Sequence, residues 1–248
     1  MVCATFRFYE ELNDFLPRAR RRTEFTVPCA RAATTKHMIE ALGVPHTEVE
    51  LILVNGESCG FERLLREGDR VAVYPKFETF DIRPLLRVRQ APLRSLRFVA
   101  DAHLGGLARL LRMGGFDTIY SNLIDDPTVA ALSEEDGRIA LTRDRELLKR
   151  RGITHGCYVR ALKPADQFAE IVQRLDLAAS ARPFKRCLSC NTALRVVPKA
   201  AVAEQLPPSV RAAHQEFLRC DTCQGVFWRG SHWQRMNALL ATQGIAAG

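Results

Sequence analysis

Two short, mainly apolar segments, each followed at once by an aspartate, constrain the fold of this chain most. One runs from Leu96 to Ala100 and leads into Asp101, and the other runs from Arg138 to Arg143 and leads into Asp144. Short apolar runs bounded by polar residues are typical of buried strands in a parallel sheet. Because a parallel α/β sheet carries its functional groups just past the carboxyl ends of its strands, we expect both aspartates at that edge.

The segments around these strands predict the same layout. Residues 104–111 repeat apolar side chains as one face of a helix does, and Gly114-Gly115 ends that helix. The other predicted elements are a strand at 116–120, a helix that begins at Asp126-Pro127, a strand at 138–142 and a helix at 144–150. This β-α-β-α-β-α order predicts a doubly wound α/β domain.

Aspartates gathered at a sheet edge bind hard divalent cations such as Mg²⁺ or Mn²⁺, which can orient water at a phosphodiester. The competing interpretation is structural, because an aspartate after a strand is often a helix cap. Asp126, which precedes Pro127, fits a cap as well as it fits a ligand. For Asp101 and Asp144 we favour a functional role.

Three segments around these aspartates resemble a known family. The segments FVAD (98–101), LARLLRMGGFD (107–117) and LTRD (141–144) are similar to the Mut-seven C-terminal RNase family, a branch of the PIN-type nuclease fold. The resemblance implies a PIN-like, metal-dependent RNase domain with Asp101 and Asp144 at the metal. It extends more loosely to Asp126, with Asp125 beside it as the alternative ligand.

Residues 1–80 predict a separate β-rich domain with one main helix at 35–42. Its β-β-α-β-β order is that of a ubiquitin-like β-grasp domain, and LILVNG (51–56) and EGDRVAVYP (67–75) resemble small sulfur-carrier proteins. A carrier needs a free C-terminal Gly-Gly, whereas this chain continues through residues 76–80, so we reject that role. A docking or an RNA-positioning role stays open.

Two Cys-x-x-Cys pairs lie near the C-terminus, and 29 residues separate them: Cys187, Cys190, Cys220 and Cys223. This pattern predicts a structural zinc ribbon, and four thiolates leave the zinc no open position for catalysis. The predicted organisation is therefore a β-grasp domain (1–80), a basic linker (81–95), the PIN-like domain (96–182) and the ribbon with its C-terminal segment (183–248).

The positive charge is concentrated in the linker and the ribbon. The net charge of the chain is +8, and residues 183–248 hold eight Lys and Arg against three Asp and Glu. Basic surface of this kind can meet phosphate, although the chain also has 30 Arg against 6 Lys, which composition alone can explain. The residues predicted to hold RNA are Arg109, Arg112, Arg143, Arg229 and Trp233. Phe227 is expected in the ribbon core, and Trp233 is open between that core and RNA.

Two functions remain at this stage. The first is a Mg²⁺- or Mn²⁺-dependent ribonuclease, and the second is a non-catalytic RNA-binding factor that acts on structured RNA such as tRNA or the ribosome. The aspartates favour the first, while the weaker third carboxylate and the basic ends leave the second open. No apolar stretch reaches the ~18 residues of a membrane span, and the first residues do not resemble a signal peptide. We therefore expect a cytoplasmic protein.

Overall fold

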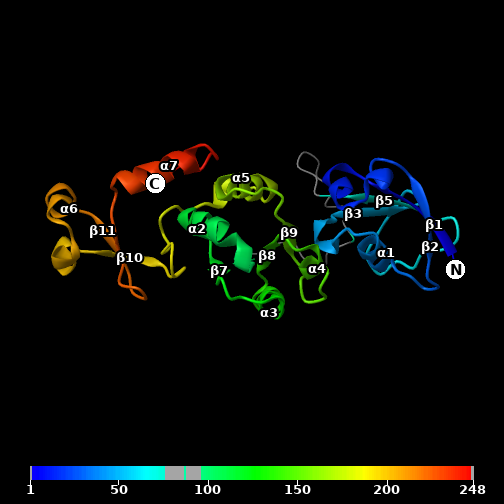
Figure 1. The fold of residues 1–248 in the computed structure, drawn as a ribbon, viewed down its shortest axis with the longest axis horizontal. Helices are drawn as coiled ribbons and strands as arrows, with labels where there is room; N and C mark the ends of the chain where they lie inside the picture. The colour runs from blue at the N-terminus through cyan, green and yellow to red at the C-terminus, as the bar shows by residue number, and fades with distance from the viewer. Residues whose placement is uncertain (1, 76–86, 88–95, 247–248) are drawn as a thin grey trace. The chain divides into compact units, whose positions relative to one another are not determined.

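The structure is a computed structural model that describes residues 2–75, 87 and 96–246. The chain forms two compact units. The first unit comprises residues 1–95 and 126–158, and the second comprises residues 96–125 and 159–248 (Figure 1).

A five-stranded sheet dominates the first unit. Its strands are β1 (Val2–Phe8), β2 (Phe25–Cys29), β3 (Leu51–Val54), β4 (Glu57–Cys59) and β5 (Arg70–Tyr74), in the order β2-β1-β5-β3-β4. β1 and β5 are parallel, and the other neighbours are antiparallel. Asn55 and Gly56 form the β3–β4 turn with φ of 55° and 88°, as the Asn-Gly signal predicts.

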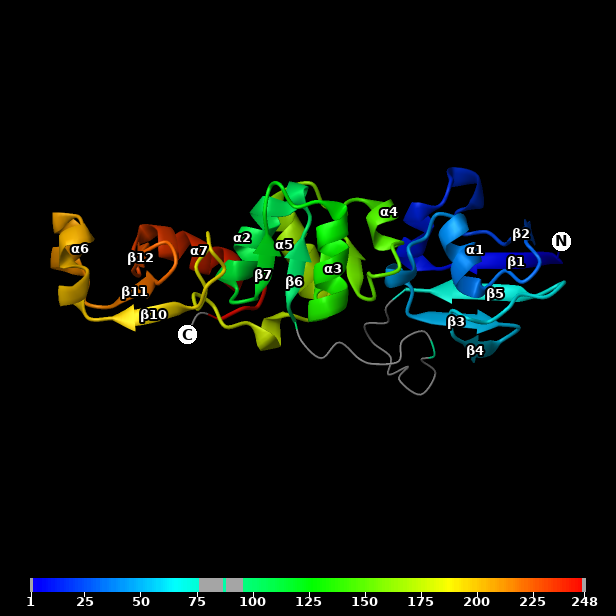
Figure 2. The same cartoon turned by 90° about the horizontal axis from the view of Figure 1, so that it is seen from below.

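Helix α1 (Thr35–Ala41) covers one face of this sheet (Figure 2). Alternate residues of β1, namely Ala4, Phe6 and Phe8, are buried in the same core as Ile39 of α1. Short 3-10 helices η1 (Glu10–Phe15), η2 (Arg18–Arg20) and η3 (His46–Glu48) complete this part. The arrangement is the predicted ubiquitin-like β-grasp.

The first unit also contains an α-β-α-β segment from the α/β part of the chain. It consists of α3 (Asp126–Asp136), β8 (Ile139–Thr142), α4 (Arg145–Leu148) and β9 (Gly156–Tyr158). β8 and β9 are parallel, with Thr142 opposite Tyr158. All four residues of β8 are buried, which explains why this strand is apolar without alternation.

The second unit contains the other α/β elements: β6 (Phe98–Ala100), η5 (Ala102–Leu104), α2 (Gly105–Met113), β7 (Thr118–Tyr120), α5 (Pro164–Arg174) and η6 (Ala178–Ser180). β6 and β7 pair in parallel, which confirms an α/β fold with parallel strands. The predicted apolar face of α2 is buried, and α2 packs against α5 in both views (Figures 1 and 2). Gly115 ends α2 with φ of 94°, as predicted.

The cysteine module (residues 183–246) completes the second unit. Its antiparallel sheet has the order β10 (Leu194–Val197), β11 (Phe217–Cys220) and β12 (Val226–Phe227), and α7 (Ser231–Ala241) follows. The long spacer between the cysteine pairs contains β10, η7 (Lys199–Ala201), η8 (Ala203–Gln205) and α6 (Pro208–Ala213). Val197, Val202, Leu206 and Phe217 form a core there, so the extra length is a folded insertion.

The expectation that Phe227 fills this core is wrong. Arg219 pairs with Val226, so strand alternation puts Val226 on the same face of the sheet as Phe217. Phe227 therefore points to the opposite face and is only half-buried.

The predicted basic linker, residues 81–95, lies outside the described residues except for Arg87, which is exposed. In the part of the chain that the structure describes, no helix has the length and apolar character of a membrane span.

Candidate functional site

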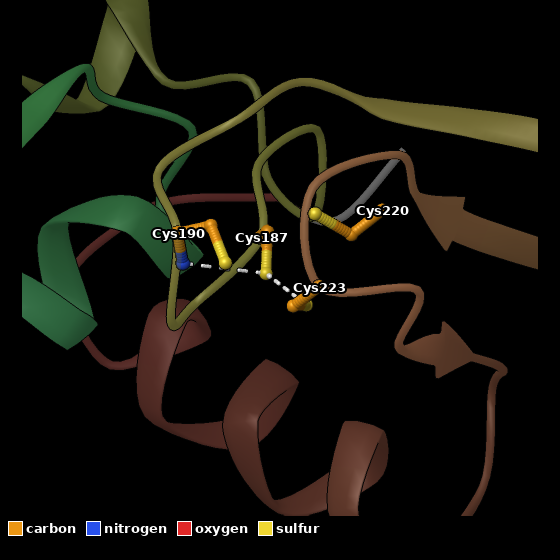
Figure 3. Close-up of side chains that lie close together, drawn as sticks. All are labelled: Cys187, Cys190, Cys220 and Cys223. Atoms are coloured by element: carbon orange, nitrogen blue, oxygen red, sulfur yellow. Dashed lines mark hydrogen bonds between the residues drawn. The ribbon is translucent and has the colours of Figure 1, made fainter.

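The sulfur atoms of the two Cys-x-x-Cys pairs converge. The four Sγ atoms lie within 4.8 Å of one another, and those of Cys187 and Cys223 are 3.7 Å apart (Figure 3). Each pair sits on a tight turn, one before β10 and the other after β11. Tetrahedral zinc with Zn–S bonds of about 2.3 Å needs sulfur separations of about 3.8 Å, so the cluster fits such an ion.

Backbone N–H groups prepare these sulfurs for metal binding. The Cys190 N–H donates to Cys187 Sγ at 3.5 Å. Burial raises the pKa of the Cys187 thiol, whereas the N–H groups of Cys190 and Ser189 lower it. Burial also raises the pKa of Cys220, but the N–H groups of Cys223 and Thr222 help to bring it down to about 7. N–H donors stabilise the thiolate, which is the form that binds a metal.

Arg112 joins the first cysteine turn to α2. Its Nε donates to Thr118 O at 3.0 Å, and its Nη1 donates to Leu188 O at 3.0 Å and Ser189 O at 2.9 Å. The residue is only 5% exposed, and burial lowers the pKa of its guanidinium. The predicted contact of Arg112 with RNA is therefore corrected to a structural role, because the side chain is buried and its donors already serve backbone carbonyls.

A second set of contacts, not anticipated from the sequence, holds the same turn. Asn191 accepts from the Thr118 N–H at 3.0 Å and donates to Asp117 Oδ1 at 2.8 Å. Arg186 pairs with Asp117 at 3.5 Å. Asn191 has φ of 64°, a conformation that asparagine tolerates well, and its place directly after Cys190 was the one available signal.

Asp101 lies directly after β6, as predicted. Its side chain caps η5 by accepting from the His103 N–H at 3.3 Å, and the residue is 9% exposed. A buried carboxylate that accepts one backbone hydrogen bond still has lone pairs for a second partner. The cap interpretation and a ligand role are therefore compatible at Asp101.

Asp144 lies two residues past the end of β8 and is exposed. Its carboxylate caps α4 by accepting from the Glu146 N–H at 2.8 Å, and its own N–H donates to Thr142 Oγ1 at 2.9 Å. These two bonds fix a tight turn over residues 142–146, which we call the Asp144 turn.

Asp126, the third predicted carboxylate, forms an ion pair with Arg150 Nη2 at 3.2 Å. Both side chains are nearly half exposed, and surface pairs of this kind contribute less than about 1 kcal/mol. A cation can compete for such a carboxylate, but Asp126 does not start as an unpaired ligand. Its neighbour Asp125 is exposed.

The other predicted RNA contacts lie on the surface. Arg109 on α2 and Arg143 beside Asp144 are exposed. The guanidinium of Arg229 lies 5.4 Å from the centre of the Trp233 ring, and that ring contacts Phe184 at 5.2 Å. Trp233 packs on Phe184 and stays partly accessible, and its contact with RNA stays a prediction.

Comparisons with known proteins bear on both halves of the chain. The family described as "Mut7-C RNAse domain" matches residues 96–240, and "Mut7-C ubiquitin" matches residues 1–81. Two crystal structures of small archaeal modifier protein 1 from Haloferax volcanii are similar to part of the chain, both at 17% identity. They cover 31% and 32% of this chain and 100% and 99% of their own, with TM-scores of 0.26 and 0.25. The search of curated proteins gave no significant match.

Proposed function

Because the chain belongs to the Mut7-C RNAse domain family, we propose that it is a metal-dependent ribonuclease of PIN-like fold that hydrolyses phosphodiester bonds in RNA. The family itself indicates a nuclease-type function and does not favour the non-catalytic alternative. The observation that carries the metal site is that Asp101 directly follows β6 and Asp144 lies two residues past the end of β8, and that both strands pair in parallel.

In this proposal, Asp101 and Asp144 bind one Mg²⁺ or Mn²⁺ ion through carboxylate oxygens, with Asp126 or Asp125 as a further ligand. Each of the two principal carboxylates keeps one oxygen on a backbone N–H, which holds its orientation before the cation arrives. Hard oxygen ligands of this kind suit Mg²⁺ and Mn²⁺. The bound cation supplies charge neutralisation at the scissile phosphate and activates water.

Exposed arginines bind the RNA backbone in this proposal. Arg109 lies on α2, eight residues after Asp101, and Arg143 precedes Asp144 directly. Arg229 and Trp233 offer a guanidinium over an aromatic ring, a combination that binds phosphate and stacks on unpaired bases. Arg112 is left out because it is buried.

The cysteine cluster has a structural role in this proposal. Four thiolates complete the coordination of one zinc ion, so that ion holds the two turns together and takes no part in cleavage. The nuclease metal and the zinc are therefore distinct, and they differ in ligand type and in sensitivity to weak chelators.

The test is cleavage of total RNA by the purified full chain with Mn²⁺, with Mg²⁺ and with excess EDTA. We expect products with at least one of the metals and none with EDTA. Glu135→Gln, an exposed substitution on α3, is the matched control for loss of one carboxylate and should cleave at the wild-type rate. Binding of RNA without cleavage under either metal would contradict the enzyme and leave an RNA-binding factor.

A further inference from the structure

Residues 126–158 pack against the ubiquitin-like domain within the first unit. Tyr158, the last residue of β9, packs against the hydrophobic core of that domain. The Tyr158 ring also meets the Phe15 ring edge-on, with 5.2 Å between their centres. Phe15 is the last residue of η1, so the contact joins β9 to the end of that helix.

Arg145, the residue after Asp144, reaches the same place. Its guanidinium lies 4.9 Å from the Phe15 ring centre and 5.5 Å from that of Tyr158. Its Nη1 donates to Phe15 O at 3.3 Å, and its Nη2 donates to Asp14 O at 3.4 Å. A cation is favourable there because the last carbonyls of a helix carry partial negative charge.

A second group of contacts fixes the far end of the segment. The Tyr158 N–H donates to Glu48 Oε1 at 2.6 Å, and His46 Nε2 lies 3.0 Å from Ile153 O. His46 Nδ1 lies 2.7 Å from Glu40 Oε1. Both ring nitrogens of His46 therefore face acceptor oxygens. Glu48 and His46 are buried, so these contacts are shielded from water.

The segment is therefore attached to the ubiquitin-like domain at two places, one within the Asp144 turn and one further along the chain. Arg145 is held at the end of η1, and Ile153 and Tyr158 are held by η3. The carboxylate of Asp144 is one residue from the first attachment and caps the same short helix that begins with Arg145. A four-residue helix is too short to be stable alone, so its position depends on what it packs against.

We propose that the ubiquitin-like domain is a built-in positioning element that holds the Asp144 turn in place, with Arg145 as the principal positioning residue. This inference rests on the proposed function only for its catalytic consequence. It gives the N-terminal domain a docking role within its own chain. The sequence leaves this role open beside RNA positioning.

The test compares Arg145→Ala and Arg145→Lys in the full chain, with Arg151→Ala as the control. Arg151 is an exposed arginine just past the same helix. Four quantities are measured: hydrogen exchange at the Glu146 and Lys149 amides, Mn²⁺ affinity, the rate of single-turnover cleavage, and RNA affinity. The amides report local opening of the turn, and the split between cleavage and RNA affinity separates positioning from RNA contact.

We expect Arg145→Ala to speed exchange at these amides, weaken Mn²⁺ binding and slow single-turnover cleavage by about tenfold each, with RNA affinity unchanged. Arg145→Lys keeps the cation over the rings but loses the forked donors, so it should recover part of each effect. Arg151→Ala should match wild type. If Arg145→Ala does not fold, the partial effects in Arg145→Lys decide.

Unchanged exchange in Arg145→Ala overturns the inference. If RNA affinity falls while exchange is unchanged, Arg145 is an RNA contact and not a positioning residue. Either result leaves the proposed function intact if wild type cleaves RNA. Conversely, a wild type that never cleaves RNA removes the proposed function, while the exchange comparison still supports or overturns the positioning of the turn.

Discussion

Arg112 in the second unit and Arg145 in the first both donate to backbone carbonyls of another module, but in different surroundings. Arg112 is 5% exposed and makes three bonds of 2.9–3.0 Å to carbonyls. Arg145 is half-buried, makes two bonds of 3.3–3.4 Å and relies on two aromatic rings. Short bonds in a dry site make a firm anchor, whereas longer bonds beside rings allow more local motion.

The difference between the two arginines indicates that the cysteine turn is held more rigidly than the Asp144 turn. The first cysteine turn is held by Arg112 of α2 and by the bonds of Asn191 to Thr118 and Asp117. The Asp144 turn carries a carboxylate that is proposed to bind a metal ion, and it is held less tightly. Functional loops commonly belong to the less stable parts of a fold.

The largest expected effect comes from disrupting the zinc site that we propose at the four cysteines. Cys187→Ser or Cys220→Ser should abolish binding of about one zinc per chain and unfold residues 184–230, because metal binding contributes on the order of 10 kcal/mol in such sites. Elemental analysis beside hydrogen exchange measures both effects. Full protection of the module in zinc-free protein would show that its small core suffices alone.

Removal of Arg112 should have the next largest effect. Arg112→Ala leaves the carbonyls of Thr118, Leu188 and Ser189 without their donor and should cost about 3–5 kcal/mol of unfolding free energy. Denaturant unfolding measures this loss, and Arg109→Ala is the exposed control on the same helix, with little change in stability. A loss of RNA affinity without a loss of stability in Arg112→Ala would restore its predicted RNA contact.

Arg145→Ala should cost less, about 1–2 kcal/mol of the unfolding free energy of the first unit, because its bonds are longer and partly exposed. The same denaturant experiment gives this value. A cost equal to that of Arg112→Ala would mean that the two attachments are equally firm, and the comparison above would fail.

Arg229→Ala should change stability least. It should weaken RNA binding several-fold and reduce the salt dependence of binding by about one ion, because one phosphate contact is lost. A binding titration at several salt concentrations measures this. An unchanged slope would place Arg229 outside the RNA surface and leave it as a cover for the Trp233 ring.

Elements whose signals are local were predictable from the sequence. The apolar runs of β6 and β8, the buried face of α2 and the Asn55-Gly56 turn each depend on spacing within a few residues. The cysteine cluster was predictable as well, because two Cys-x-x-Cys pairs have few other uses.

Contacts between distant segments were not predictable. Arg112 lies three residues after Arg109, and both read as polar positions of one helix, but Arg112 meets a turn 76 residues later. Arg145 meets Phe15 across 130 residues. The sequence also does not show why residue 106 is a glycine. A Cβ there would come within 2.5 Å of the Pro164 ring on α5. No local pattern records which distant surface will cover a side chain.

The most direct test of the proposed nuclease is single-turnover cleavage of a defined RNA beside a binding titration, with Asp101→Asn, Asp144→Asn and Glu135→Gln. Loss of one carboxylate charge should slow Mn²⁺-dependent cleavage at least about a hundredfold, or ~3 kcal/mol of transition-state stabilisation, with RNA affinity equal or slightly tighter. Glu135→Gln should match wild type in both quantities. Cleavage at the wild-type rate by both Asp101→Asn and Asp144→Asn would contradict a metal site at the ends of these strands.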